Sequence, residues 1–214
     1  MDTSRYNSQC INNLGFSSLA GRVFVTSPGE AYRNPVSYSH YNQPLETGGI
    51  RGESRIWGDA SIETQSASIN EILRVGSSMQ FNDLELAFAL SVARTESGFN
   101  PDAAAGTTSA SGIGQLIDQT AKNVGVSQNK RFDLKENVKG YLKLLGGLIQ
   151  TAKKQLPEDN QARIFERAYG LYHDGPSLAY GGQKLARLRV LPQIPIMLDW
   201  IRCNSLKTLP SQKN

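Results

Sequence analysis

The spacing of apolar residues becomes helical only after about residue 66. Ile69, Ile72 and Leu73 share one face of a first predicted helix. Asn82 is a residue type that caps helices, so we expect a second helix from Asp83 to about Thr95. The apolar positions of this second helix are Leu86, Phe88, Leu90, Val92 and Ala93. They make it largely apolar.

Further helical segments follow toward the C-terminus. We expect a short helix from about Ile113. The clearest helix spans residues 133–155, where an apolar stripe runs along one face and most lysines lie off it. Another covers residues 161–172 and ends at a His-Asp-Gly-Pro sequence, because Gly and Pro stop helices. The last segment, which two prolines interrupt, runs to about Arg202. Strand signals are sparse in this part, so the predicted fold class is mainly α.

The first 66 residues differ in character. They are rich in Ser, Asn, Tyr, Gly and Pro and show no sustained helical period. Short apolar pieces such as the Val-Phe-Val run at residues 23–25 are candidate strands, and the sequences around residues 26–30 and 48–54 indicate turns. The pattern divides the chain into a loop-rich N-terminal extension of unknown role (1–66), a helical domain (67–204) and a tail (205–214).

Composition excludes several classes of protein. With 214 residues, 39% of them hydrophobic and 20% charged, the chain is neither mainly disordered nor collagen-like. No apolar run approaches the ~18 residues of a membrane span. The N-terminus lacks the cationic start and apolar core of a secretory signal peptide. Cys10 and Cys203 allow a single bridge, but we expect two inert thiols.

The net charge of +4 is unevenly distributed. Residues 1–121 contain 7 Arg, no Lys and 12 acidic residues, whereas residues 122–214 contain 10 Lys, 6 Arg and 7 acidic residues. A cationic C-terminal half indicates an anionic partner: nucleic acid, acidic lipid or a bacterial wall polymer. The alternative is that these lysines are simply the solvated side of helices. Charge alone does not decide between the two.

Several kinds of chemistry lack the residues they need. His40 and His173 are the only histidines, and neither has a partner at ligand spacing, so we expect no metal and no cofactor. Neither a G-x-S-x-G sequence nor a phosphate-binding loop occurs. Basic residues are not clustered with interleaved aromatics, so nucleic acid is not an expected partner.

Glu96 is the strongest candidate for chemistry. It ends the largely apolar second helix, and a loop of small residues that a polymer can approach closely follows it. A carboxyl at the end of a buried helix has a raised pKa, and such an acid can protonate a glycosidic oxygen. The alternative by position alone is an ordinary surface residue at a helix C-terminus.

The sequence around Glu96 resembles the lytic transglycosylase (SLT) family, relatives of goose-type lysozymes. The matching elements are Glu96-Ser97, Asn100-Pro101-Asp102-Ala103, Gly112-Ile113-Gly114-Gln115-Leu116 and Thr120-Ala121. Downstream, the family's D-x-x-x-N…G…Y-L-x-x-L helix is resembled by Asp133, Asn137, Gly140, Tyr141, Leu142 and Leu145. The family's A-Y-N-A-G-P element is resembled by residues 171–176. The resemblance covers residues 71–176 and implies a lysozyme-like α-helical domain.

The resemblance also implies roles for individual residues. Glu96 becomes the catalytic acid/base, and Ser97 and Gln115 become glycan contacts. Tyr172 becomes the partner of Glu96 or of the substrate, with Tyr169 as a rival for that role.

This chain departs from the family pattern at two of these positions. Gly114 replaces the usual Met, which we expect to widen the cleft. His173 replaces the usual Asn, which leaves its contact undefined, although a substrate contact is expected there.

The mechanism depends on whether a second carboxylate takes part. In lytic transglycosylases one Glu acts with the substrate's own N-acetyl group and a 1,6-anhydro ring forms, whereas goose-type lysozymes carry an Asp just after the Gln. Asp118 lies three residues beyond Gln115, and the alternative for it is a cap of the next helix. Asp102 is a further candidate near Glu96. We favour Glu96 alone.

The resulting hypothesis is a peptidoglycan lytic transglycosylase that cleaves the MurNAc–GlcNAc β-1,4 bond. The alternatives are a hydrolytic muramidase that uses Glu96 with Asp118, and a catalytically inactive glycan-binding module. Without a signal peptide, we expect action in the bacterial periplasm or wall after delivery by a secretion apparatus, a phage particle or a holin-assisted lysin. An effector of this kind implies an immunity protein as a second partner.

Overall fold

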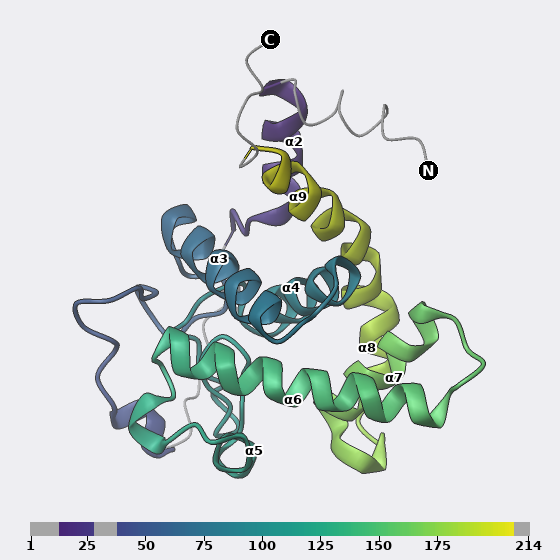
Figure 1. Cartoon of the computed structure of the whole chain (residues 1–214). Helices are drawn as coiled ribbons and strands as arrows, with labels where there is room; N and C mark the ends of the chain where they lie inside the picture. The colour runs from purple at the N-terminus through teal and green to yellow at the C-terminus, as the bar shows by residue number, and fades with distance from the viewer. Residues whose placement is uncertain (1–12, 28–37, 208–214) are drawn as a thin grey trace.

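The chain folds as an assembly of α-helices (Figure 1). The computed structural model describes residues 13–27 and 38–207, and these residues form helices, turns and two isolated β-bridges but no strand. The helices are α2 (Asn13–Val23), α3 (Ile62–Ser78), α4 (Asp83–Ser97), α5 (Asp118–Val124), α6 (Leu134–Gln155), α7 (Gln161–Asp174), α8 (Gly182–Leu185) and α9 (Ile194–Lys207). The predicted mainly α fold class is confirmed. No helix within the described ranges is long and apolar enough to cross a membrane.

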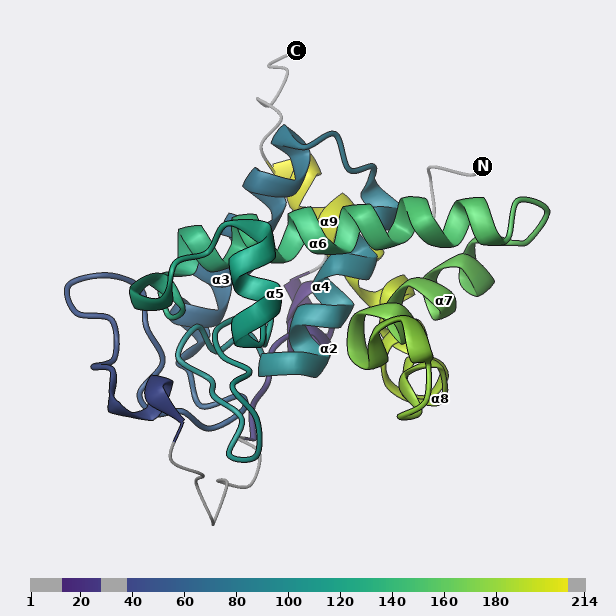
Figure 2. The same cartoon turned by 90° about the horizontal axis from the view of Figure 1, so that it is seen from below.

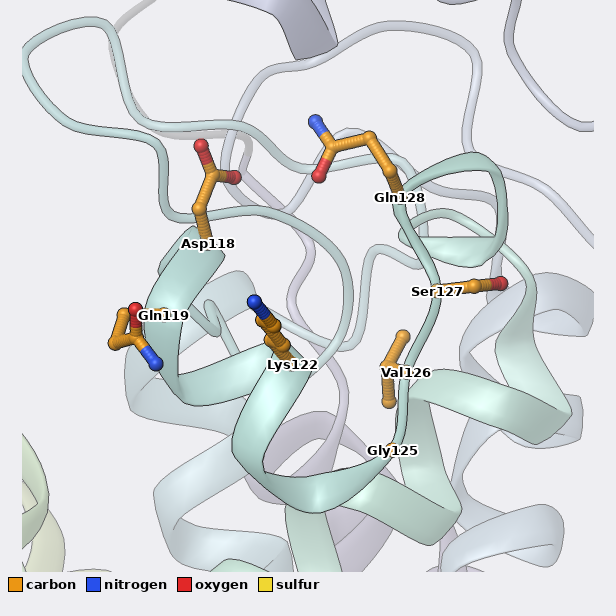
Figure 3. Close-up of a pocket in the computed structure, with 7 residues that line it drawn as sticks. All are labelled: Asp118, Gln119, Lys122, Gly125, Val126, Ser127 and Gln128. Carbon is orange, nitrogen blue, oxygen red and sulfur yellow. The ribbon is translucent and has the colours of Figure 1, made fainter.

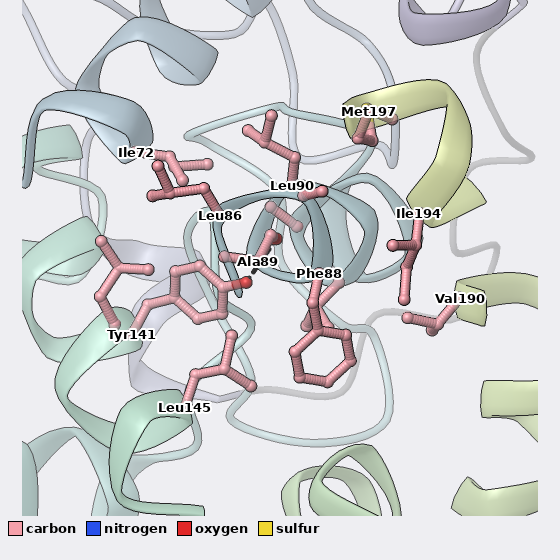
Figure 4. Close-up of a cluster of buried hydrophobic side chains, with 14 of the residues drawn as sticks. Ile72, Leu86, Phe88, Ala89, Leu90, Tyr141, Leu145, Val190, Ile194 and Met197 are labelled. Atoms are coloured by element: carbon pink, nitrogen blue, oxygen red, sulfur yellow. Dashed lines mark hydrogen bonds between the residues drawn. The ribbon is translucent and has the colours of Figure 1, made fainter. Parts of the chain in front are cut away.

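Helix α4 runs through the middle of the core, and Figure 4 shows side chains of its neighbours packed around it. Every residue from Leu86 to Ala93 is buried. Phe88 stacks on Phe165 of α7 with ring centroids 4.2 Å apart. On another face, Tyr141 of α6 donates a hydrogen bond of 2.6 Å to the carbonyl of Ala89. Because close-packed neighbours touch α4 on all faces, its position and rotation are fixed.

Local signals set both ends of α4. The Asn82 side chain accepts hydrogen bonds from the N–H groups of Leu84 and Glu85, and the Glu85 carboxylate accepts from the N–H of Asn82. This capping box confirms the predicted start. At the other end, Gly98 adopts the left-handed conformation that terminates helices. The helix therefore ends two residues later than predicted, and Glu96 lies in its last turn.

The prediction of a short helix from Ile113 is wrong, because that segment is a turn and α5 begins only at Asp118. Gly112 and Gln115 have φ values of +77° and +45°, which interrupt a helix. Gly112 also has no room for a side chain, since a Cβ there would lie 2.3 Å from Nδ2 of Asn137.

The strand expected at residues 23–25 is also wrong. Val23 ends α2, and the next two residues continue as buried chain without a strand partner. Phe24 packs edge-on against Trp200 of α9, with ring centroids 5.3 Å apart. The Gln65 side chain accepts from the N–H of Val25 at 2.8 Å and donates to its carbonyl at 2.9 Å. One side-chain amide thus satisfies the backbone groups that a neighbouring strand would otherwise pair.

The prolines near the C-terminus divide the last segment without ending it. A π-helical turn (Ala186–Val190) and a 3₁₀ turn (Leu191–Gln193) lead from α8 into α9. Pro195 lies in the first turn of α9, where its missing N–H has no helical partner to lose. The helix therefore extends to Lys207, beyond the predicted end.

One of the two cysteines lies on α9. Cys203 is disulfide-bonded, so the expectation of two inert thiols is wrong. Cys10 lies outside the described residues.

Residues 38–61, here called the strap, pack against the loop that follows α4. Asn100 of that loop donates through its side chain to two strap carbonyls, at distances of 3.0 and 2.6 Å. Trp57 of the strap donates through Nε1 to the carbonyl of Thr95 at 3.0 Å. The contact is so close that a Cβ on Gly52 would lie 1.8 Å from Oδ1 of Asn100. The loop that carries the family-like Asn-Pro sequence is therefore held by the N-terminal part of the chain.

The predicted domain boundary at residue 66 falls inside α3. The division of the chain into an extension, a domain and a tail stays a prediction.

Asp102 is completely buried where the strap meets this loop. Burial raises its pKa to about 7, and the charge of Glu46 adds to the rise, while Arg55 and the backbone N–H groups of Glu46 and Gly52 oppose it. The ordinary pKa of an Asp is 3.8. At mildly acidic pH the folded chain therefore binds a proton at Asp102 that the unfolded chain has released, and this proton stabilises the fold.

Replacing Asp102 with Asn removes this titration. The stabilisation is fully present below about pH 4 and is lost as the pH rises to about 7. We expect the urea midpoint of the wild-type protein to fall between pH 5 and pH 8, and that of Asp102→Asn to fall less, as measured by tryptophan fluorescence. Glu158→Gln, at an exposed acid, is the control and keeps the wild-type dependence. Identical pH dependence in Asp102→Asn and the wild type would contradict this account.

Candidate active site

Glu96, in the last turn of α4, accepts a hydrogen bond from Tyr169 of α7, with 2.7 Å between Oε1 and the phenol oxygen. Burial raises the pKa of Glu96, and the Tyr169 hydrogen bond and the charge of His173 reduce this rise. Part of the residue nevertheless remains exposed. The carboxyl therefore holds its proton more tightly than a surface Glu and can still be reached from solvent.

Three tyrosines lie beside Glu96. Tyr172 has its ring centroid 6.0 Å from that of Tyr141 and 6.3 Å from that of Tyr169. Burial raises the pKa of all three hydroxyls, and the negative charge of Glu96 adds to the rise. They therefore remain protonated donors at neutral pH, and their rings supply the low-polarity surroundings that desolvate the acid.

The two rival tyrosines have different partners. Tyr169 donates to Glu96, whereas Tyr172 donates to the carbonyl of Gly114. Both tyrosines lie on the same turn of α7, so the sequence allows either of them to reach Glu96. The packing of α7 against α4 decides that Tyr169 is the one that does. That either one contacts substrate stays a prediction.

The two predicted glycan contacts have internal partners. Ser97 is buried, and its hydroxyl donates to the carbonyl of Ala93 at 3.0 Å. The Gln115 amide nitrogen donates to the carbonyls of Ala103 and Gly112, each at 2.9 Å. These bonds hold the loop beside Glu96, and contact with glycan stays a prediction for both residues.

Gly114 does not widen the site as expected. A Cβ at Gly114 would lie 2.8 Å from Cβ of Tyr141, so the tyrosine already fills that space. Asn137 of α6 accepts from the N–H of Gly114 at 3.0 Å and donates to the carbonyls of Ser111 and Arg131. Asn137 thereby fixes the turn of the Gly-Ile-Gly-Gln sequence, a role that its spacing in the motif does not reveal.

Asp118 forms an ion pair with Arg131, whose side chain is completely buried while that of Asp118 is 52% exposed. Arg131 also donates to the carbonyls of Ser109 and Leu116. The alternative that Asp118 caps the next helix is wrong, because Ile117 is the N-cap residue of α5 and no side chain caps this helix. Asp118 instead supports the loop by neutralising a buried cation. Arg131 escaped sequence reasoning because nothing in the pattern marks an arginine as buried.

A cavity of about 440 Å³ lies beside Asp118, as Figure 3 shows. It is lined by Asp118, Gln119, Lys122, Gly125, Val126, Ser127 and Gln128. Glu96 and the tyrosines are not among these residues. In Figure 2, α5 and the nearby loops lie on one side of the end of α4, with α7 and α8 on the other. The cavity is therefore separate from the Glu96 carboxyl.

His173, at the end of α7, lies on the same side of the site as Tyr169. Their ring centroids are 6.0 Å apart. Its ring nitrogen Nδ1 is 2.6 Å from Oδ1 of Asp174. Asp174 is a residue that sequence reasoning missed, and its position directly after His173 is the only signal the sequence offers.

Within residues 13–27 and 38–207, no group of three or more His, Cys, Asp or Glu side chains is arranged to hold a metal ion. The chemistry supported by the described residues is that of a desolvated carboxyl with hydrogen-bond donors around it.

Comparison with known proteins agrees with this arrangement. A family model, the transglycosylase SLT domain, matches residues 75–177. No curated protein and no solved structure matches the chain. The matched segment runs from the end of α3 to the turn after α7, and so contains Glu96, Tyr169, His173 and the loop that Asn137 holds. Residues 75–177 therefore form a transglycosylase SLT domain, consistent with the lytic transglycosylase family of the lysozyme-like superfamily.

Proposed function

We propose that the chain is a peptidoglycan lytic transglycosylase in which Glu96 alone serves as acid and base at the MurNAc–GlcNAc β-1,4 bond. The observation that carries the proposal is the Glu96 carboxyl itself. It lies at the end of a buried helix, has a raised pKa, and accepts a hydrogen bond from Tyr169 inside an SLT domain. A carboxyl that keeps its proton toward neutral pH can donate it to a leaving oxygen.

In the first step, Glu96 gives its proton to the glycosidic oxygen, and the bond from that oxygen to the muramyl C1 breaks. The GlcNAc O4 leaves as a hydroxyl, and the substrate's own N-acetyl oxygen stabilises the electron-poor C1. In the second step, the Glu96 carboxylate removes the proton of the muramyl C6 hydroxyl while O6 bonds to C1. The 1,6-anhydro ring closes, Glu96 regains its proton, and no water is consumed.

Tyr169 is suited to both steps. Its hydroxyl stays protonated, so it continues to donate to Glu96 whether the carboxyl is neutral or ionised. A hydrogen bond to an ionised carboxylate is stronger than one to the neutral acid. Tyr169 therefore stabilises the carboxylate that exists between the two steps and keeps its orientation.

The contacts of Asp118 argue against the hydrolytic alternative. A second carboxylate acting as general base must be free to position water. Asp118 instead neutralises the buried Arg131 guanidinium, which itself holds two loop carbonyls. A hydrolytic muramidase thus requires Asp118 to leave a structural ion pair.

The surface and the disulfide fit a wall substrate. Lys135, Lys139 and Lys143 are exposed along α6, where they can attract the anionic groups of peptidoglycan. Cys203 is disulfide-bonded, which suits the oxidising side of a bacterial membrane. We propose action in the periplasm or wall. A secretion apparatus, a phage particle and an immunity protein remain proposals about its delivery and partners.

Glu96→Gln keeps the shape of the side chain and removes its acid. We expect release of muropeptides from purified sacculi to fall at least about a hundredfold, because a lost general acid costs that much or more. Mass spectrometry of the wild-type digest should show 1,6-anhydro-muramyl ends.

The control is Glu158→Gln, at an exposed acid, which retains wild-type release. Reducing ends in the wild-type digest would establish the hydrolase instead. Binding of sacculi without any cleavage by the wild type would establish an inactive glycan-binding module, and undiminished release by Glu96→Gln would refute the assignment of the acid.

Asp118→Asn separates a structural from a catalytic carboxylate. We expect unchanged products and a rate within about twofold of wild type, but a stability loss of about 1–2 kcal/mol because the half-exposed partner of a buried Arg is removed. Turbidity clearing, product mass and urea unfolding measure these effects. A change from reducing to anhydro ends in the variant would support a role for Asp118 in hydrolysis.

Tyr169→Phe and Tyr172→Phe form a matched pair on one helix. Tyr169→Phe removes the hydrogen bond to Glu96, so we expect activity to fall about tenfold and the high-pH limb of the pH–rate profile to move to higher pH. Tyr172→Phe should lower stability with the limb unchanged, since its hydroxyl bonds Gly114. A shift of the limb only in Tyr172→Phe would reverse the assignment of the two residues.

A further inference from the structure

The strap holds the last turn of α4 on both sides of Glu96. Trp57 of the strap donates through Nε1 to the carbonyl of Thr95 at 3.0 Å, and the N–H of Gly58 donates to the carbonyl of Ser97 at 2.9 Å. Thr95 and Ser97 are the residues directly before and after Glu96. Because the last carbonyls of a helix have no partner within it, the strap supplies donors that fix this end of α4.

The backbones of the strap and of α4 also approach each other closely here. Gly98, the left-handed residue that ends α4, has no room for a side chain, since a Cβ there would lie 2.6 Å from Cα of Gly58. The same Cβ would lie 3.2 Å from Cε2 of Trp57. Glycine at position 98 therefore lets the strap pack directly on the helix end, and a shift of the strap moves the backbone that carries Glu96.

The part of the strap that carries Trp57 is itself fixed. Within it, the N–H of Asp59 donates to the carbonyl of Ile56 at 3.2 Å. The carbonyl of Arg55 accepts from the N–H of Ala104, in the loop that follows α4, at 3.1 Å. The indole is thus presented to the helix end from a turn that is bonded both internally and to its neighbour.

The strap lies outside the segment that matches the SLT family model, which begins at residue 75. The matched segment contains Glu96 and Tyr169, whose hydrogen bond of 2.7 Å requires the end of α4 to be correctly placed against α7. It does not contain the donors that fix the carbonyls on either side of Glu96. Placement is important because a displacement of about 1 Å of a catalytic group can lower a rate about a hundredfold.

We propose that the strap is part of the catalytic apparatus, and that Trp57 is a positioning residue whose hydrogen bond to Thr95 holds the Glu96 carboxyl in place against Tyr169. The inference rests on the proposed function for its kinetic consequence, whereas the coupling of the strap to the helix end does not. Trp57 acts through the backbone of α4 and needs no contact with glycan. Its loss therefore lowers kcat and leaves KM unchanged.

Trp57→Phe removes the Nε1–H donor and keeps an aromatic ring. We expect kcat on soluble, uncrosslinked glycan strands to fall about tenfold with KM unchanged, because a hydrogen bond that orients the acid is lost. The matched control is Trp200→Phe, at the only other tryptophan, which packs on Phe24 and retains wild-type kcat. A wild-type kcat in Trp57→Phe would overturn the proposal.

The double variant Trp57→Phe/Tyr169→Phe separates positioning from a merely structural role. Both changes release the same carboxyl, so we expect the loss of kcat to stay near tenfold instead of reaching about a hundredfold. Losses that multiply would mean that Trp57 acts independently of the Glu96–Tyr169 contact, and would overturn the proposal.

The coupling is also measurable without activity. Hydrogen exchange of the amides of residues 94–98, followed by NMR, reports opening of the helix end. We expect these amides to exchange about fivefold faster in Trp57→Phe and at the wild-type rate in Trp200→Phe, while residues 86–93 keep wild-type exchange in both and so show that the fold persists. Unchanged exchange at residues 94–98 in Trp57→Phe would overturn the proposal. If exchange accelerates but the wild-type protein releases no muropeptides, the proposed function fails and the coupling stands.

A second replacement isolates the hydrogen bond, because Phe is also smaller than Trp. In the Trp200→Phe background Trp57 is the only tryptophan, so a tryptophan auxotroph can supply β-(3-benzothienyl)alanine at this position alone. This analogue has sulfur in place of the indole N–H and nearly the same shape. We expect it to reproduce both the loss of kcat and the faster exchange. Wild-type values for both would assign the effect to ring volume and would overturn the role of the hydrogen bond.

Discussion

From Leu86 to Ala93, helix α4 has no side exposed to water, because α3, α6, α7 and α9 all pack against it. A helix enclosed in this way cannot rotate or slide without moving its neighbours, and its end is therefore a fixed point. Glu96 stands at that end. The same packing that buries the apolar residues of α4 brings Tyr169 to the carboxyl, although 73 positions separate them in the chain. The packing of the core thus also sets the geometry of the candidate acid.

Buried polar groups shape the loops around this fixed point. Asn137 ties the Gly-Ile-Gly-Gln turn to α6, and the buried Arg131 gathers two carbonyls and Asp118. The strap does the same for the loop after α4 through Asn100. Because an unsatisfied buried polar group is costly, each of these side chains admits one loop conformation. The small residues near Glu96 are thereby held in place without large side chains of their own.

The electrostatics of the site follow from what surrounds each carboxyl. Glu96 is desolvated beside neutral tyrosine rings and His173, so its pKa rises. Asp174 is also buried, yet its pKa falls, because hydrogen-bond donors surround it. The surroundings of the two acids thus shift their pKa values in opposite directions. The site contains one carboxyl suited to donate a proton and another suited to hold a histidine.

Much of the fold was readable from the sequence, because helix periodicity and caps are local. The α6 stripe, the Asn82 cap and the stop at the His-Asp-Gly-Pro sequence predicted helices where they occur. Glu96 was also readable, since a carboxyl at the end of an apolar helix is a local pattern. The turn after Gly112 could not be predicted from the sequence, because Asn137 stabilises it from another helix.

The sequence predicted the helices α3, α4, α6, α7 and α9, the candidate acid and the resemblance to the SLT family, but it missed α2. Only the tertiary structure decided that Tyr169 and not Tyr172 bonds Glu96, that Asp118 serves a buried arginine, and that the strap holds the loop after α4. Each of these depends on which side chains meet across helices distant in sequence. That meeting is set by close packing in the core, which no local pattern encodes.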